Sequence, residues 1–297
     1  MDLPDFLIIG APRSGTTSLY NYLRQHPRIF MSPQKEARFF AHEHREADYQ
    51  GPADAYAYNR KVIGDADAYR ELFEGRTSDQ LAGEASPVYL YRSEQAAPRI
   101  HHHVPEAKLI ANFRNPVERA YSDFLNMVRL GWEPIHDFER ALADEERRID
   151  AHWSPFYRYR AKGFYADRLQ AYFDYFDREQ MRFFLFREFQ EEPSSVVREA
   201  FAFLDVDPEV PIDTQSQHNR SGLPRSQLLH RLLTHPVAEW TMRGPLRRIR
   251  TTLRDWNTAY EKPPMDPAVR KDLEDGYRED VRKLEALIDR DLSHWLS

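Results

Sequence analysis

An eight-residue stretch near the start of the chain combines two glycines with a single cation: Gly10-Ala11-Pro12-Arg13-Ser14-Gly15-Thr16-Thr17. Two glycines at this spacing let the backbone curl so that successive N–H groups point at one place, which makes a cradle for a phosphate-like anion. The spacing is that of the nucleoside-triphosphate P-loop, but Thr16 stands where the lysine belongs, and Arg13 is the only cation of the stretch. The sequence therefore predicts an anion cradle whose cation is Arg13, ahead of the position that the P-loop lysine occupies. The missing lysine disfavours a conventional ATPase or GTPase.

The candidate ligands of the cradle run through this stretch and into the helix that should follow it: Arg13, Ser14, Gly15, Thr16, Thr17 and Ser18. A turn rich in Gly and Ser that binds nothing is the alternative interpretation. The cation, the two threonines and the flanking strand and helix patterns favour an anion site over that alternative.

A second anion site is predicted later in the chain, at Arg114 and Ser122. Arg114 follows an apolar run that ends at Phe113, and Ser122 lies eight residues farther on, two turns into a predicted helix. An arginine fork and a hydroxyl suit a phosphate, and open α/β sheets bind their ligands at the carboxyl ends of the strands. Taken alone, such an arginine more often forms a surface ion pair, so the second site depends on the first.

Both sites need strands and helices that alternate along the chain. Apolar runs predict strands at residues 5–11, 81–85, 107–113 and 181–187. Helical spacing predicts helices at residues 15–26, 115–128, 165–176, 193–204, 226–240 and 273–288. The helix after Arg114 has the clearest start, with Asn115 as N-cap, Pro116 in the first turn and Glu118 in a capping box.

This alternation predicts an α/β fold with a central parallel sheet flanked by helices, of the P-loop-containing nucleoside triphosphate hydrolase-like type. The chain has 297 residues, which suits one large α/β domain. We expect a single domain over residues 1–297, mostly helical from about residue 205 onward.

Composition excludes several classes of function. The chain has 42 Lys and Arg against 48 Asp and Glu, a net charge of −6, which argues against a nucleic-acid partner held by a basic surface. It has no Cys, so disulfides, thiolate metal sites and cysteine nucleophiles are excluded. The first residues lack a basic signal region, and the apolar run at 6–11 is far too short to span a bilayer. We expect a cytoplasmic protein without membrane insertion.

Four motifs occur in order at residues 8–20, at Lys35-Glu36-Ala37-Arg38-Phe39-Phe40, at Gly83-Glu84-Ala85-Ser86-Pro87 and at 114–122. Their order and spacing resemble the sulfotransferases that use 3′-phosphoadenosine 5′-phosphosulfate (PAPS), specifically bacterial members similar to the heparan sulfate sulfotransferase type. The resemblance runs over nearly the whole chain, and the first and last motifs are specific. It implies PAPS as the donor, 3′-phosphoadenosine 5′-phosphate (PAP) as the product, and no metal ion.

The resemblance also implies residue roles. The first loop would hold the 5′-phosphosulfate, with Arg13 stabilising the leaving phosphate where the family often has a lysine. Arg114 and Ser122 would hold the 3′-phosphate, and Glu36 matches the catalytic glutamate that acts as general base. The family's basic-glycine loop, which closes over the 3′-phosphate, has its nearest candidate residues here at Arg220, Ser221 and Gly222.

The neighbours of Glu36 leave its pKa open. Phe39 and Phe40 would remove water from the carboxylate and raise its pKa, whereas Lys35 and Arg38 would lower it or bind an anionic acceptor. The residues alone favour a solvated charged run at this place, and the family match reverses that preference.

Other features carry less weight. His42 and His44 are alternative bases, and consecutive side chains in His101-His102-His103 diverge, which disfavours a metal site there. Ala85 stands where some relatives have a lysine near the acceptor, which weakens the case for an anionic sugar. Candidates for an aromatic acceptor cleft are Tyr89, Tyr91, Trp132, Trp153, Phe156, Tyr157, Tyr159, Phe164 and Tyr165.

The predicted activity is transfer of a sulfuryl group from PAPS to a hydroxyl or amine of a small-molecule or glycan acceptor. A P-loop kinase-type phosphotransferase that uses ATP and magnesium is the first alternative. A non-catalytic nucleotide-binding protein is the second. Sugar, lipid, polyketide, amine and peptide acceptors stay open, as does the oligomeric state.

Overall fold

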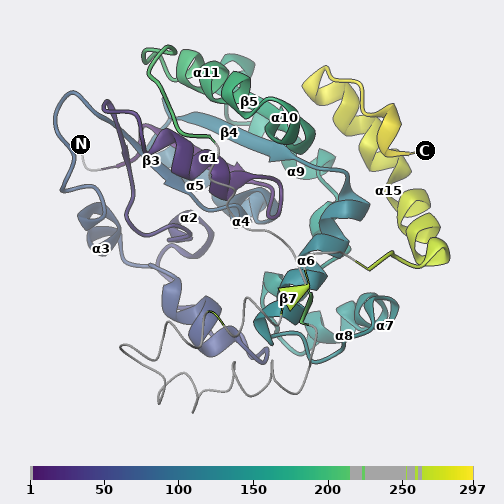
Figure 1. Cartoon of the computed structure of the whole chain (residues 1–297). Helices are drawn as coiled ribbons and strands as arrows, with labels where there is room; N and C mark the ends of the chain where they lie inside the picture. Colours follow the sequence, from purple (N-terminus) through teal and green to yellow (C-terminus); the bar gives the residue numbers. More distant parts are fainter. Residues whose placement is uncertain (1–2, 215–222, 225–251, 253–257, 260–262, 297) are drawn as a thin grey trace.

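A five-stranded parallel sheet forms the centre of the protein in a computed structural model, which describes residues 3–214, 223–224, 252, 258–259 and 263–296 (Figure 1). The strands are β1 Phe6–Gly10, β2 Ile29–Met31, β3 Leu81–Ala85, β4 Lys108–Phe113 and β5 Met181–Leu185. They lie in the order β2-β3-β1-β4-β5. A separate antiparallel ladder joins β6 Leu223–Pro224 to β7 Thr258–Ala259.

Helices connect the strands and cover both faces of the sheet. They are α1 Thr16–Leu23, α2 Phe39–His42, α3 Ala66–Glu71, α4 Val88–Tyr91, α5 Ser93–His103, α6 Pro116–Leu130, α7 Phe138–Ala143, α8 Glu145–Asp150, α9 Ala166–Phe173, α10 Phe186–Glu191, α11 Pro193–Phe203 and α15 Pro267–Ile288. Single turns of 3₁₀ or π helix are η1 Asp54–Tyr58, η2 Asn59–Lys61, η3 Pro155–Tyr157, η4 Ala161–Gly163, η5 Arg178–Gln180 and η6 Ser293–Trp295.

The sheet separates two layers of hydrophobic packing. Helices α1 and α11 cover one face, and α5 and α9 cover the other, with α15 packed on α9 (Figure 1). Side chains of β1 divide between the faces: Phe6 and Ile8 pack toward α1, while Leu7 and Ile9 pack toward α5. β1 is therefore buried on both faces, as its continuous apolar run predicts.

The closing helix α15 has the predicted apolar stripe, which consists of the buried residues Leu273, Tyr277, Val281, Leu284 and Ile288. A buried acid on the same helix, Asp280, accepts hydrogen bonds from the backbone N–H groups of Tyr165 (2.8 Å) and Ala166 (3.0 Å). Since these residues begin α9, α15 satisfies the free N–H groups at that helix end. Within the described ranges, every helix is too short or too polar to cross a bilayer.

The predicted α/β architecture with a central parallel sheet is confirmed. Four strands lie where the apolar runs place them, although β5 ends at Leu185 because α10 begins at Phe186. β2 was not predicted, since three residues are too few for a recognisable pattern. The helix predicted at 226–240 lies outside the described residues, and the single-domain extent over residues 1–297 stays a prediction.

Candidate active site

The loop between β1 and α1 lies at the carboxyl edge of the sheet. Gly15 adopts a φ of +88°, a left-handed conformation that other residues disfavour, and Thr16 is the first residue of α1. No side chain caps this helix at its N-terminus. The N–H groups of its first turn are therefore available to an anion, as the spacing of the glycines predicts.

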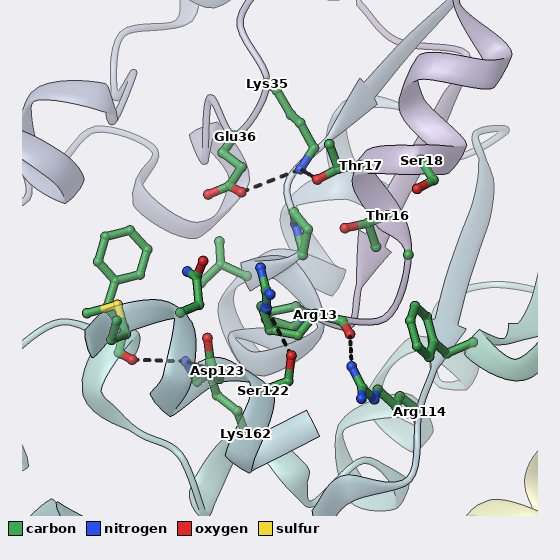
Figure 2. Close-up of a pocket in the computed structure, with 18 of the residues that line it drawn as sticks. Arg13, Thr16, Thr17, Ser18, Lys35, Glu36, Arg114, Ser122, Asp123 and Lys162 are labelled. Atoms are coloured by element: carbon green, nitrogen blue, oxygen red, sulfur yellow. Dashed lines mark hydrogen bonds and ion pairs between the residues drawn. The ribbon is translucent and has the colours of Figure 1, made fainter. Parts of the chain in front are cut away.

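Arg13 joins this loop to the second predicted site. Its Nε donates to Ser122 Oγ at 3.4 Å, and its carbonyl oxygen accepts from Arg114 Nη1 at 3.3 Å (Figure 2). A pocket of about 930 Å³ is lined by residues of both sites, including Arg13, Gly15, Thr16, Thr17, Ser18, Arg114 and Ser122. The two sites predicted from separate motifs thus face one cavity.

Helix α6 positions the second site. Arg114 directly follows β4, and Ser122 lies on α6. The Oδ1 of Asn115 accepts from the backbone N–H groups of Val117 (2.9 Å) and Glu118 (3.3 Å), which confirms the predicted N-cap. The start of α6, and with it the spacing from Arg114 to Ser122, is fixed by this cap.

Two partly buried cations make this end of the pocket receptive to an anion. Burial lowers the pKa of Arg13, and Asp123 opposes that shift. Burial also lowers the pKa of Arg114 to about 10, with Glu118 raising it and Arg13 lowering it. The Arg114 guanidinium lies over the ring of Phe186, 4.5 Å from its centroid. Desolvated cations that repel one another are stabilised by a bound anion, so a phosphate suits this end of the pocket.

Glu36 faces the same pocket from the loop between β2 and α2 (Figure 2). Its backbone has a φ of +63°, and its N–H donates to the carbonyl oxygen of Ala85 at 2.9 Å. Its carboxylate lies 2.6 Å from Arg38 Nη2 and 3.6 Å from Lys35 Nζ, and 35% of the side chain is exposed. Arg38 is 1% exposed, so this segment is not a solvated charged run.

The charges around Glu36 decide its pKa. Burial raises the pKa of Glu36, but Lys35 and Arg38 lower it by more, and the result is a pKa of about 2. Of the two opposing effects that the sequence left open, the lowering by Lys35 and Arg38 therefore outweighs the raising by burial. The carboxylate is ionised at neutral pH, which is the form that accepts a proton.

Lys35 has a position that the sequence did not reveal. Its Nζ donates to Thr17 Oγ1 at 2.9 Å and lies 3.6 Å from Glu36 Oε1. The ammonium therefore lies between the cradle and the carboxylate (Figure 2). The signal that could have found it is Thr16 in place of the P-loop lysine, since such a cradle needs a cation from another segment.

The pocket also has aromatic, apolar and basic lining. Trp132 and Phe156 stack with their ring centroids 5.7 Å apart. They line the pocket together with Tyr58, Lys61, Met127, Arg129 and Leu130. Of the aromatic residues predicted for an acceptor cleft, these two line the pocket, whereas four are buried in the core: Tyr89, Tyr157, Tyr159 and Tyr165.

Other predicted ligands are placed differently. The side chain of Ser14 is fully buried and does not line the pocket, so a contact with a ligand would have to come from its backbone. Arg220, Ser221 and Gly222 lie outside the described residues.

None of the histidines that the structure describes lines the pocket. His42 is buried against the Tyr58 hydroxyl, 3.2 Å from it, and burial together with nearby arginines lowers its pKa to about 3. His44 is exposed beside Glu43, and His103 pairs with the same carboxylate. In the part of the chain that the structure describes, no group of three or more His, Asp or Glu side chains could hold a metal ion.

Comparison with known proteins supports one family. A model described as "Sulfotransferase family" matches residues 4–209, which is more than half of the chain. The crystal structure of a sulfotransferase from Alicyclobacillus acidocaldarius matches with a TM-score of 0.79 and 36% identity, covering 99% of each chain. Sulfotransferase structures have the P-loop nucleoside triphosphate hydrolase-like fold that the sequence predicts.

Among curated relatives, bifunctional heparan sulfate N-deacetylase/N-sulfotransferase 4 of Mus musculus is 28% identical over 69% of this chain and 23% of its own length. Heparan sulfate glucosamine 3-O-sulfotransferase 6 of Mus musculus is 29% identical over 68% of this chain and 52% of its own length. The chain thus spans about a quarter to a half of these relatives. Because the family match covers most of the chain and the fold match nearly all of it, the chain belongs to the sulfotransferase family.

Proposed function

We propose that the protein transfers the sulfuryl group of PAPS to a hydroxyl or amine of a small-molecule or glycan acceptor. The observation that carries this proposal is the common pocket, which is lined by the cradle, by Arg114 with Ser122, and by Glu36. PAPS has anionic groups at two ends, and the pocket offers cations at two places. The carboxylate of Glu36 is the group suited to take a proton.

Arg114 and Ser122 bind the 3′-phosphate in this proposal. A guanidinium fork and a hydroxyl match the donors that a terminal phosphate accepts, and the burial of Arg114 strengthens the attraction. This contact would distinguish PAPS from ATP, which has no phosphate at that position. Arg220, Ser221 and Gly222 remain proposed ligands of the same phosphate.

The cradle binds the 5′-phosphosulfate. The N–H groups at the start of α1 and the hydroxyls of Thr16, Thr17 and Ser18 supply hydrogen-bond donors. Arg13 supplies a fixed positive charge. The Lys35 ammonium, held by Thr17, supplies the charge that the P-loop lysine provides elsewhere.

In the proposed step, the acceptor oxygen or nitrogen attacks the sulfur, and the bond between sulfur and the 5′-phosphate oxygen breaks. The acceptor proton passes to a carboxylate oxygen of Glu36. The bonding electrons leave with PAP, whose growing negative charge is stabilised by Arg13, Lys35 and the N–H groups of α1. The sulfuryl group of the donor is already activated, so this step does not require a metal ion.

The low pKa of Glu36 makes it a weak base in the absence of donor. An anionic donor beside Lys35 offsets the effect of that ammonium, and the pKa of Glu36 should then rise. The acid limb of the pH profile of kcat reports the pKa of the base in the loaded enzyme. The acid limb of the profile of kcat/KM reports its pKa in the free enzyme. We therefore expect a higher apparent pKa in kcat than in kcat/KM.

The lining formed by Trp132 and Phe156 suits an acceptor with a flat or ring-shaped apolar face, because aromatic side chains pack on sugar faces and planar rings alike. A screen of acceptor classes with labelled PAPS tests which class the enzyme uses.

Calorimetry with PAP, 5′-AMP and ATP tests the donor. The protein should prefer PAP to 5′-AMP, and Arg114→Ala should weaken PAP binding by about tenfold or more while leaving 5′-AMP unaffected. Arg278→Ala, on the exposed side of α15, is the matched control and should bind PAP like the unmodified protein. Equal binding of ATP with a magnesium requirement would support a kinase instead.

Turnover with PAPS tests the base. Glu36→Gln should keep its affinity for PAP and lose transfer, because the amide cannot accept the proton. Unchanged turnover in this variant would remove Glu36 as the base. Absence of transfer by the unmodified protein across all acceptor classes would favour a non-catalytic nucleotide-binding protein.

A further inference from the structure

A buried acid lies behind the pocket without lining it. Glu84 is 0% exposed in β3, a strand paired on both sides within the sheet. Its Oε1 accepts from the Ser86 hydroxyl at 2.5 Å, and Ser86 is also 0% exposed. Its Oε2 has no hydrogen-bond partner among the described residues. An ionised carboxylate in such a place would be costly, whereas a protonated one is tolerated.

The segment that carries Glu36 is attached to the end of β3, the residue after it and α4 by three backbone N–H groups. Glu36 N–H donates to the Ala85 carbonyl at 2.9 Å, and Arg38 N–H donates to Ser86 Oγ at 3.0 Å. Phe40 N–H donates to the Tyr89 hydroxyl at 3.4 Å (donor and acceptor both buried). Two of the three acceptors are therefore side-chain hydroxyls.

The direction of the Ser86 hydroxyl proton decides whether it can accept. A serine has one O–H, and here that proton is given to Glu84, which leaves the lone pairs of Oγ to the Arg38 N–H. The bond matters because Glu36 and Arg38 have φ values of +63° and +61°, a left-handed conformation that costs energy in residues other than glycine. The surrounding hydrogen bonds must hold this backbone in place.

We propose that Glu84 is a positioning residue: its neutral carboxyl orients the Ser86 hydroxyl, which holds the Arg38 amide and thereby directs the carboxylate of Glu36 into the pocket. The proposal rests on the function of Glu36 as base. Glu84 itself does not line the pocket and touches no substrate in this account.

The electrostatic surroundings support the neutral form. Burial raises the pKa of Glu84 to about 7, while the hydroxyls of Ser86 and Tyr89 lower it, the Glu36 carboxylate raises it and Lys35 lowers it. The other titratable groups that sense this carboxyl are the buried hydroxyls of Tyr69 and Tyr172. Above about pH 7, ionisation would place a second negative charge behind Glu36, with one oxygen lacking a hydrogen bond.

Three variants test the role in catalysis. Glu84→Gln is neutral at every pH and can still accept from Ser86, so its kcat should stay within about threefold of that of the unmodified enzyme. Ser86→Ala and Glu84→Ala should lower kcat by about tenfold or more with little change in KM for PAPS. If Glu84→Gln loses as much kcat as Glu84→Ala, or if Ser86→Ala keeps full kcat, the proposal is wrong.

Amide hydrogen exchange provides a readout that does not depend on Glu36 being the base. Exchange at residues 36–40 should be faster by about tenfold in Ser86→Ala and unchanged in Glu84→Gln, with PAP affinity retained in both. Unchanged exchange in Ser86→Ala would overturn the positioning role. Full turnover in Glu36→Gln together with faster exchange in Ser86→Ala would instead refute only the assignment of the base, so the two failures are distinguishable.

Discussion

Two cations at the cradle differ in what they can do chemically. Arg13 stays charged at any useful pH and offers fixed donors, whereas Lys35 has a compact ammonium that can also release a proton. Arg13 is directed toward Ser122, and Lys35 toward Thr17 and Glu36. The charge that a P-loop lysine concentrates at one residue is therefore divided here between two segments of the chain.

Arg38→Met should raise the pKa of Glu36. Burial raises that pKa, and the cations now lower it to about 2, so removal of the guanidinium 2.6 Å away leaves burial less opposed. A higher pKa means that less of the carboxylate is ionised at a given acidic pH. The acid limb of kcat/KM should therefore move up from near pH 2 into the range from pH 4 to 6, which pH–rate profiles measure.

Arg38→Lys is the matched control, because it keeps a positive charge at the same place. Its acid limb should stay close to that of the unmodified enzyme, and PAP affinity should show that both variants keep the donor site. An Arg38→Met profile that coincides with the unmodified profile would mean that Glu36 does not govern the acid limb.

The pKa of Glu36 could not be derived from the sequence for a geometric reason. Glu36 and Arg38 are two positions apart, and their side chains meet because both residues have a positive φ. Nothing in a glutamate or an arginine indicates that conformation. The identity of Glu36 as a site residue came from the family motif, and its electrostatics came from the fold.

At the scale of elements, α6 is the helix whose start the sequence predicts best. Asn115 and Pro116 each have a first-turn role that does not depend on distant contacts. The capping box predicted for Glu118 is not formed, because its carboxylate pairs with Arg270 and Arg114. The spacing of Arg114 and Ser122 along this helix was therefore predictable. Strand β2 was not, because Ile29–Met31 is defined by its pairing with β3 and not by a local pattern.

Asn115→Ala should lower the free energy of unfolding by about 1 kcal/mol, because two backbone N–H groups at the start of α6 lose their acceptor. Urea denaturation measures this change. PAP binding should weaken as well, since Arg114 and Ser122 depend on the same helix start.

Asn115→Asp separates the cap from the other contact of this side chain, the donation from Nδ2 to the Trp295 carbonyl at 3.1 Å. Aspartate can cap the helix and cannot make that donation. If Asn115→Asp is as unstable as Asn115→Ala, the link to Trp295 and not the cap is responsible.

At the scale of the whole molecule, a buried ion pair joins the segment after α6 to α8. Glu133 and Arg148 side chains are both 0% exposed and form two hydrogen bonds, of 2.8 and 2.9 Å. Glu133→Ala leaves a buried guanidinium with Asp144 as its remaining partner. The free energy of unfolding should fall by about 3–5 kcal/mol, measured by urea denaturation.

Glu191→Ala is the matched control for this loss. It removes an exposed ion pair with Arg187. The side chains of Glu191 and Arg187 are 57% and 67% exposed, so the free energy of unfolding should change by less than about 1 kcal/mol. If Glu133→Ala and Glu191→Ala lower the free energy of unfolding equally, burial of the ion pair does not determine its contribution to stability.

The common cavity was expected only through the family resemblance, which assigns both anion sites to one donor, and no local pattern supplies it. Each anion site was predicted from its own motif, at Arg13 and at Arg114. Their meeting depends on the strand order, in which β1 lies between β3 and β4. That order also brings Ala85, at the end of β3, against the segment of Glu36. Strand order is decided by long-range packing, which no local pattern encodes.

The pairing of β1 with β4 has a consequence for how the site comes into existence. Gly10 is opposite Ala111, and the Ala11 N–H donates to the Asn112 carbonyl at 2.6 Å, so one backbone ladder fixes how far the glycine turn lies from Arg114. A slip of one residue would displace the turn by roughly 3.3 Å and reverse the side chains of the strand. Until these two strands pair, the glycine turn and Arg114 are not held at this separation, so the proposed donor site can form only after the centre of the sheet is assembled.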